Sequence, residues 1–152
     1  MTQITSKEFY DAILGVTRDV GQLQRSYLTR ELNIEFKGDI NLVTQVDKES
    51  ERMIVERIRS VFPDHDILAE EGSGGGRKDS PYKWIIDPLD GTTNFAHRYP
   101  LFAVSIALEF KGEIVGAVVY DPNRDEMFRS FKNEKAHLND VETVSYTHLR
   151  AH

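Results

Sequence analysis

Residues 84–95 constrain this chain more than any other stretch, because they place two carboxylates directly after an apolar run. The run 84–86 predicts a buried strand, and Pro88, which has no N–H, predicts that sheet pairing stops after Asp87. Carboxylates at a strand end suit a hard cation such as Mg²⁺. The following segment 90–93 predicts a helix start whose free N–H groups can bind an anion. A cation site beside an anion site indicates metal-dependent phosphoryl transfer.

The order of elements along the chain predicts an α+β domain, with two helices followed by strands. Apolar residues recur at helical spacing over 9–27, and Thr5 with Glu8 matches a capping box. A second helix is expected from Asp47, as its N-cap, to about residue 62. The sequence predicts strands at the following positions: 66–69, 103–110, 114–120 and 127–131.

The amino-acid composition limits which partners and which cellular compartment can be expected for this chain. The net charge of −6 argues against a nucleic-acid surface driven by bulk charge. No cysteine is present, which excludes disulfides and thiolate chemistry and is compatible with a cytoplasmic protein. No apolar stretch approaches membrane-spanning length, so no membrane partner is expected.

The glycine-rich segment 72–77 lacks the Gly-Lys-Ser/Thr of a P-loop and is expected to be a plain mobile connection.

The motif at 84–95 resembles the inositol monophosphatase family of Mg²⁺-dependent, lithium-sensitive sugar and polyol phosphatases. Three other segments resemble that family in the same order, namely 37–47, 68–72 and 118–122. The resemblance implies a layered α/β sandwich of the inositol monophosphatase/fructose-1,6-bisphosphatase type, truncated after its N-terminal half. Residues 1–144 would form this half, and 145–152 are expected to be a non-native tail.

The resemblance also assigns metal ligands. It implies that Glu70, Asp87 and the backbone carbonyl of Leu89 bind a first metal ion, and that Asp87 and Asp90 bind a second. Mg²⁺ is the implied cofactor. Lys37 resembles a residue near this site whose positive charge helps to balance the local charge. Glu71 is expected to be mainly a solvent-exposed charge, with a supporting role behind the metal ligands as the alternative.

Catalytic and substrate roles follow from the same resemblance. Thr92 resembles a hydroxyl that helps to activate the attacking water, Asp47 the carboxylate that accepts a hydrogen bond from it, and Glu70 is placed with them as catalytic. The residues implied to bind the phosphate ester are Asp90, Gly91, Thr92 and Thr93. The implied reaction is hydrolysis of inositol monophosphate, a small phosphate ester, and the full-length parent is a possible homodimer.

Several alternatives stay open. Haloacid dehalogenase-type phosphatases also carry aspartates after a strand, but theirs lie two residues apart, whereas Asp87 and Asp90 lie three apart. Relatives in the same superfamily hydrolyse fructose 1,6-bisphosphate, histidinol phosphate or 3′-phosphoadenosine 5′-phosphate. A partner of the RNA machinery and a non-catalytic fragment are the remaining interpretations. Because one more metal ligand and much of the substrate pocket are expected beyond this chain, its own activity is expected to be impaired.

Overall fold

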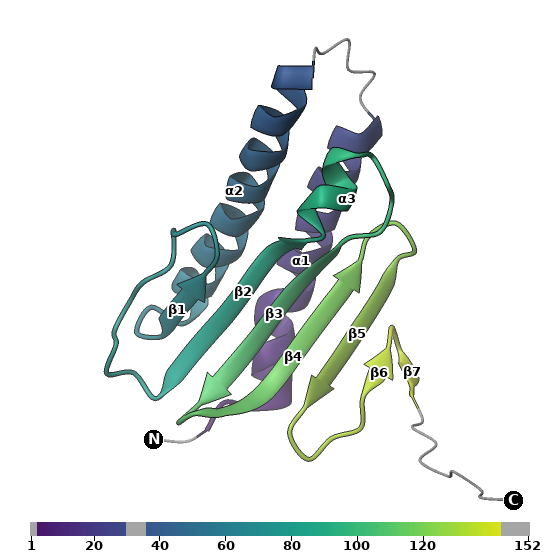
Figure 1. Cartoon of the computed structure of the whole chain (residues 1–152). Coiled ribbons are helices and arrows are strands. Elements are labelled where there is room, and N and C mark those ends of the chain that lie inside the picture. The colour runs from purple at the N-terminus through teal and green to yellow at the C-terminus, as the bar shows by residue number, and fades with distance from the viewer. Residues whose placement is uncertain (1–2, 30–35, 144–152) are drawn as a thin grey trace, which may run out of the picture.

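The chain folds into two long helices followed by a sheet, as shown by a computed structural model that describes residues 3–29 and 36–143, with only the backbone described for 36–42. This is the α+β class that the sequence predicts. Its elements, in chain order (Figure 1), are α1 (Ser6–Thr29), α2 (Phe36–Val61), β1 (Asp66–Ala69), β2 (Tyr82–Asp90), α3 (Thr92–Ala96), β3 (Ala103–Phe110), β4 (Glu113–Asp121), β5 (Glu126–Phe131), β6 (His137–Leu138) and β7 (Val141–Glu142).

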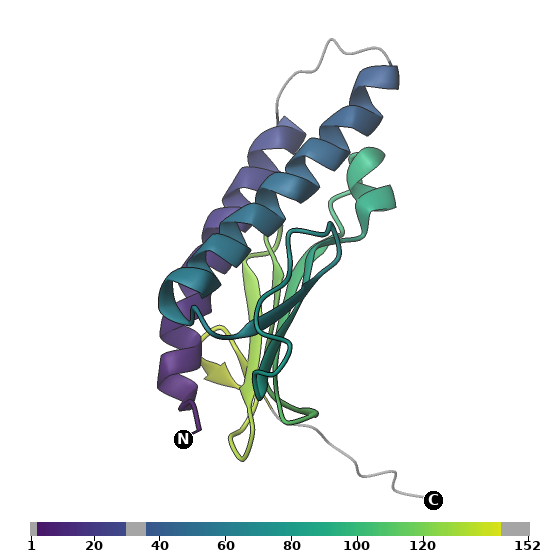
Figure 2. The same cartoon turned by 90° about the vertical axis from the view of Figure 1, so that its left-hand side faces the viewer.

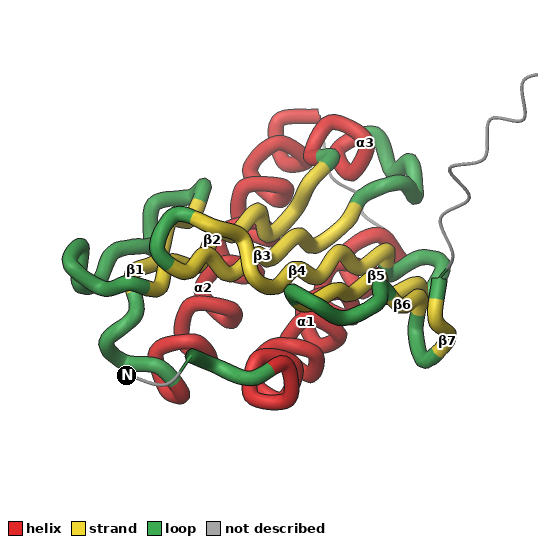
Figure 3. Tube along the Cα trace, turned by 90° about the horizontal axis from the view of Figure 1, so that it is seen from below, coloured by secondary structure: helices red, strands yellow, loops and turns green. Residues whose placement is uncertain are grey.

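All of the described strands belong to one sheet, in which their spatial order equals their order in the sequence. β1 and β2 are parallel, and every later pair is antiparallel. Helices α1 and α2 lie side by side on one face of the sheet (Figures 2 and 3). Over the middle of the opposite face, the described part of the chain places no helix. The acidic motif at the end of β2 therefore lies at one edge of a helix-backed layer.

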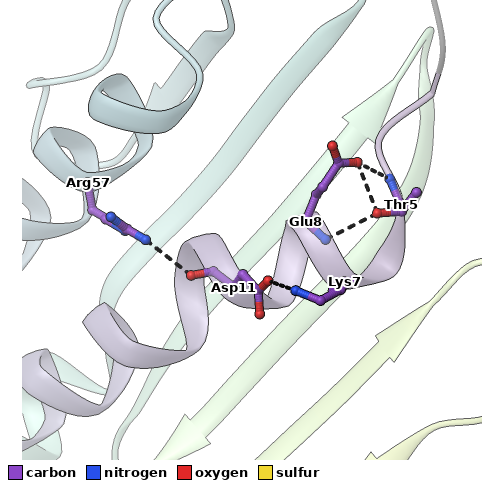
Figure 4. Close-up of polar contacts among 5 residues, drawn as sticks. All are labelled: Thr5, Lys7, Glu8, Asp11 and Arg57. Atoms are coloured by element: carbon purple, nitrogen blue, oxygen red, sulfur yellow. Dashed lines mark hydrogen bonds and ion pairs between the residues drawn. The ribbon is translucent and has the colours of Figure 1, made fainter.

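The start of α1 is the capping box that the sequence predicts (Figure 4). The backbone N–H of Thr5 donates to Glu8 Oε2 at 2.8 Å, and the N–H of Glu8 donates to Thr5 Oγ1 at 3.2 Å. Arg57 of α2 donates through Nε to the carbonyl of Ala12 at 2.9 Å and through Nη2 to that of Asp11 at 3.2 Å. These bonds join the last part of α2 to the first part of α1.

Helix α2 begins earlier than the sequence predicts. It starts at Phe36, so Asp47 lies inside the helix, and the prediction that Asp47 caps it is wrong. One glycine, Gly38, interrupts the early turns, and a single helical glycine costs only about 1 kcal/mol. Val46 is fully buried in a cluster with Leu89. Such packing stabilises helical turns whose own residues have only weak helix propensity.

Strand β2 also continues past its predicted end. Asp87 pairs with Ser105, and pairing resumes where Asp90 faces Ala103. Pro88 and Leu89 thus lie opposite the single residue 104 of β3, so β2 has one extra residue there. This is a β-bulge, and it forms because proline has no N–H to donate to the ladder. The extra residue restores Asp90 to the exposed side of the strand, the side on which Asp87 lies.

The main core fills the space between the helix pair and the sheet. The ring of Phe9 stacks on fully buried Trp84, with centroids 5.6 Å apart and an angle of 9° between planes. Gly116 leaves room for this ring, since a Cβ there would lie 2.9 Å from it. A second, smaller cluster lies beneath α3 and contains Tyr27, Val46, Leu89, Phe95 and Phe102. Trp84 and Phe95 are core residues, as predicted.

The predicted turns are confirmed. Lys111 and Gly112 join β3 to β4 with φ of 50° and 84°, the positive values that a tight hairpin turn requires. After β4, the backbone N–H of Asn123 donates to Asp121 Oδ1 at 2.9 Å, which closes the turn into β5.

Candidate functional site

The parallel pair of strands brings the two acidic motifs together. Ala69 of β1 pairs with Ile86 of β2, so the next residues, Glu70 and Asp87, follow side by side at the ends of the two strands. Segments distant in sequence thus place their carboxylates at one sheet edge. The carboxylates that interact there come from α2 (Asp47), from the turn after β1 (Glu70 and Glu71) and from the end of β2 (Asp87 and Asp90).

Asp87 lies in the middle of this group and retains a proton more readily than an ordinary aspartate. Burial, followed by the negative charges of Glu70 and Asp90, raises its pKa from 3.8 to about 6. A hydrogen bond to Glu70 raises it further, whereas the backbone N–H of Leu89, which donates to Asp87 Oδ1 at 3.2 Å, lowers it. The surroundings of Asp87 therefore hold more negative charge than its carboxylate can share without a nearby cation.

Asp47 is the more strongly shifted of the two. Its side chain faces the sheet edge from α2, and the residue is only 7% exposed. Burial, followed by the charges of Glu71, Asp87 and Glu70, raises its pKa from 3.8 to about 7. A hydrogen bond with Glu71 adds to the shift, and such a bond needs a proton on one of the two carboxyl groups.

The donor set fits a divalent cation by its chemistry. The pKa values of Asp47 and Asp87 are raised by burial and by other carboxylates, and the opposing influence on Asp87 is the backbone N–H of Leu89. No cationic side chain of the described residues is among these influences. Oxygen donors that lack a counter-charge are the ligands of Mg²⁺ and Ca²⁺. Among the side chains that the structure describes, however, no three acidic, histidine or cysteine residues are arranged closely enough to hold an ion. The structure gathers the predicted ligands in one region without forming a coordination shell.

The segment that the sequence predicts to bind an anion follows β2 directly, at Gly91 and the start of α3. Gly91 has φ of 96° and precedes α3 as its N-cap, without a side-chain cap. The positive φ favours glycine, and a Cβ at Gly91 would also be crowded, 3.1 Å from the Leu101 carbonyl oxygen. Thr92 and Thr93 are exposed in this first turn. No hydrogen bond among the described residues joins Thr92 to Asp47, so the predicted relay is not formed in this structure.

The structure corrects the expectation for Glu71 and leaves the one for Lys37 untested. Glu71 is not the solvent-exposed charge that the sequence suggests, because it is half-buried, contacts Asp47 and has its N–H bound by Glu51. The reason is that the strand ends at Ala69, so strict alternation no longer decides where Glu71 points. Lys37 lies in the first turn of α2, and its side chain is outside the described residues.

Sequence reasoning missed two buried polar residues behind the site. Gln24 of α1 is fully buried and donates through Nε2 to the carbonyl of Pro88 at 2.7 Å. Glu51 of α2 is also fully buried and accepts hydrogen bonds from the segment after β1. A signal was present for each, because both occupy the apolar stripe of an amphipathic helix, where a polar residue needs a buried partner.

The glycine-rich segment is held against the protein. The N–H of Gly75 donates to the Ile67 carbonyl at 2.7 Å, and Arg59 donates through Nη2 to the Ser73 carbonyl at 3.2 Å. A Cβ on Gly74 would lie 2.6 Å from the same Ile67 oxygen. The segment therefore packs along the edge of β1, where the sequence suggests only a mobile connection.

Fold and site together define an α+β protein with a carboxylate cluster suited to divalent cations at the edge of a helix-backed sheet. Residues 5–151 match the model of the inositol monophosphatase family, and the chain belongs to this family. The resemblance seen in the sequence is thus confirmed. The family is generally metal-dependent. The match extends past residue 144, and the proposed boundary of a non-native tail at 145 lies outside the described residues and stays a prediction.

Relatives of two kinds are similar to the chain. It is 40% identical to an inositol monophosphatase of Dictyostelium discoideum, over 98% of this chain and 57% of that protein. It is 47% identical to the Nus factor SuhB of Pasteurella multocida, over 86% of this chain and 49% of that protein. The solved inositol monophosphatase of Anabaena (Nostoc) sp. PCC 7120 superposes with a TM-score of 0.80 at 39% identity, over 93% of this chain and 51% of that one.

The chain therefore spans about half the length of these relatives. Among the described helices, none combines the length and apolarity needed to cross a membrane.

Proposed function

We propose that the whole protein is a Mg²⁺-dependent phosphate monoester hydrolase that acts on inositol monophosphate. The observation that carries this proposal is the cluster of carboxylates at the ends of β1 and β2, where burial and then mutual repulsion raise the pKa of Asp87 to about 6. A cluster that lacks positive charge gains most from a bound cation. Membership of the inositol monophosphatase family supports the reaction class. Because the chain spans about half of its relatives, the activity is proposed for the whole protein.

Each residue of the cluster has a proposed role. Glu70, Asp87 and Asp90 would hold the divalent ions, together with the Leu89 carbonyl. When bound, such ions neutralise phosphoryl oxygens and lower the pKa of bound water. The chain's own groups would position the ester, with the backbone N–H groups of Gly91 and of the threonines Thr92 and Thr93 donating to phosphate oxygens.

Asp47 would serve as the proton acceptor behind Thr92. A pKa of about 7 suits a group that holds or takes a proton near neutral pH. In the proposed relay the Thr92 hydroxyl donates to Asp47, which requires the exposed Thr92 side chain to turn towards it. Lys37 would contribute positive charge nearby.

The proposal is tested with the variant Asp87→Asn in the whole protein. Phosphate release from inositol 1-phosphate in the presence of Mg²⁺ is expected to fall by at least about 10²-fold, because the central carboxylate is lost. Asp11→Asn, which changes an exposed acid on α1, is the matched control and should keep the wild-type rate. Turnover of Asp87→Asn within a few-fold of wild type would refute the site. Turnover of fructose 1,6-bisphosphate or 3′-phosphoadenosine 5′-phosphate in preference to inositol phosphate would assign a different substrate in the same superfamily.

A second candidate function is binding to the RNA machinery. The observation that favours it is the 47% identity to a Nus factor SuhB. Binding would use a surface and not the carboxylates, so the two functions separate in one variant. If Asp87→Asn loses phosphatase activity yet recovers the same transcription factors in a pull-down as wild type, the binding function is independent of catalysis. If wild type recovers none, this candidate is refuted.

A further inference from the structure

Glu51 stands out among the polar groups that the proposed chemistry does not use. It is fully buried on α2, one turn after Asp47, and it faces the turn that follows β1. Its Oε2 accepts a hydrogen bond from the backbone N–H of Glu71 at 2.5 Å, and its Oε1 accepts one from the backbone N–H of Ser73 at 2.7 Å. The Ser73 hydroxyl also donates to Oε1. Both carboxylate oxygens are therefore engaged by one short segment.

The partners of Glu51 are unusual for a buried acid. No lysine, arginine or histidine of the described residues forms an ion pair with it, and its three hydrogen bonds replace a counter-charge. Burial of a carboxylate is costly unless such donors compensate it. A hydrophobic residue would serve better if this position only filled space, since its neighbours Ile54 and Ile58 on the same stripe are fully buried and apolar. The hydrogen bonds of Glu51 thus indicate that this residue holds the backbone of residues 71–73 in place.

That segment contains the acidic pair of the site. Glu70 and Glu71 lie beyond the last paired residue of β1, Ala69, so the ladder does not set their direction. The carboxylates of Glu70 and Glu71 nevertheless reach different partners, Asp87 and Asp47 respectively. The contact of Glu51 with the N–H groups of Glu71 and Ser73 holds the backbone next to these two side chains.

We propose that Glu51 is a positioning residue that clamps the backbone of residues 71–73 and thereby aims Glu70 at Asp87, in the arrangement that receives the divalent cation. The inference rests on the proposed function for the cation itself, but the clamp concerns contacts of the metal-free chain. A carboxylate is needed because two backbone N–H groups approach two different oxygens. In Glu51→Gln one of these N–H groups meets an NH₂ group, and two donors face each other.

The clamp is tested first without metal, by amide hydrogen exchange followed with NMR in EDTA. In Glu51→Gln the amides of Glu71 and Ser73 are expected to exchange at least about tenfold faster than in wild type, relative to the amide of Ile106 in the sheet. The control Ile58→Val removes a buried methyl group from the same helix and should leave this ratio unchanged. Wild-type protection of both amides in folded Glu51→Gln would overturn the clamp.

The consequence for the cation is tested with Mn²⁺ alone, by titration followed with electron paramagnetic resonance. The dissociation constant of Glu51→Gln is expected to rise about 10- to 100-fold, as is typical when a group that supports metal ligands is lost. Ile58→Val should bind Mn²⁺ as wild type does. If Glu51→Gln loses amide protection but binds Mn²⁺ with wild-type affinity, the positioning role is refuted. If wild type binds no Mn²⁺, the proposed metal site fails, while the exchange experiment still decides the clamp.

A milder variant covers the case in which Glu51→Gln does not fold. Ser73→Ala removes the hydroxyl donor and keeps the buried charge and both backbone donors. Faster exchange at Ser73 and weaker Mn²⁺ binding, by smaller factors than for Glu51→Gln, are expected. Wild-type values for both in Ser73→Ala would count against the proposal.

Discussion

The raised pKa of Asp47 predicts that the metal-free protein loses stability as pH rises. An unfolded aspartate ionises near pH 3.8, whereas the folded carboxyl keeps its proton up to about pH 7. Between these values the folded state binds more protons, so the free energy of unfolding decreases as pH increases. The loss is complete above pH 7. In Asp47→Asn no proton is involved, and this part of the pH dependence should disappear.

The size of the effect follows from the same two values. A difference between 3.8 and about 7 corresponds to at most about 4 kcal/mol, of which somewhat more than half falls between pH 5 and pH 8. Glu70 and Asp90 are exposed, so solvent screens part of the repulsion. We therefore expect wild type to lose about 1–2 kcal/mol more than Asp47→Asn between pH 5 and pH 8.

Urea denaturation at pH 5 and pH 8, in EDTA and followed by circular dichroism, measures this difference. Glu56→Gln is a suitable control on the same helix, because it removes an exposed carboxylate that pairs with Arg52 at 2.9 Å. Such surface pairs contribute about 0.3–0.5 kcal/mol, and the control should keep the wild-type pH dependence. If Asp47→Asn follows the same pH dependence as wild type, burial and the neighbouring carboxylates do not raise the pKa of Asp47 in the folded state, and the reasoning on the cluster is wrong.

Two other predictions concern regions away from the cluster. Burial lowers the pKa of His65, whose Nδ1 accepts a hydrogen bond from Trp84 Nε1 at 3.0 Å. The contribution of His65 to the free energy of unfolding is therefore full above about pH 6.5 and declines as pH falls below that value. Unfolding at pH 7.5 and 5.5 should show a larger decline for wild type than for His65→Phe, and equal declines would contradict this. On the sheet face away from α1 and α2, Phe128 is 43% exposed beside Val119, and the chain is expected to self-associate there. Phe128→Lys should shift sedimentation velocity profiles towards monomer, and a wild-type chain that is monomeric at high concentration would count against the prediction.

The strands and turns could largely be predicted from the sequence because their signals are local. Alternation over 103–110 and the Lys111-Gly112 pair define a hairpin within a short span, and the Thr5–Glu8 capping box marks the start of α1. The bulge in β2 was only partly predictable. Pro88 indicates that pairing is interrupted, but the resumption at Asp90 depends on the partner strand β3.

The acidic motifs themselves were visible in the sequence, since each lies next to an apolar strand and the spacing of Asp87 and Asp90 is explicit. Their meeting at one edge required the parallel pairing of β1 with β2, a contact between separate segments. Whether Glu71 is a surface charge or a partner of Asp47 could not be decided locally, because it lies in a turn whose backbone is bound by Glu51 of α2, a residue distant in the sequence.

The sequence by itself determined the family, the fold class and the residues that carry the proposed chemistry, because these depend on short patterns read along the chain. Only the tertiary structure decided how far α2 extends, that Glu51 and Gln24 are buried behind the site, and that Asp47 holds its proton to about pH 7. The physical reason is distance along the chain. Glu51 meets Glu71 across 20 residues and Gln24 meets Pro88 across 64, and burial and charge repulsion arise only when such segments pack together.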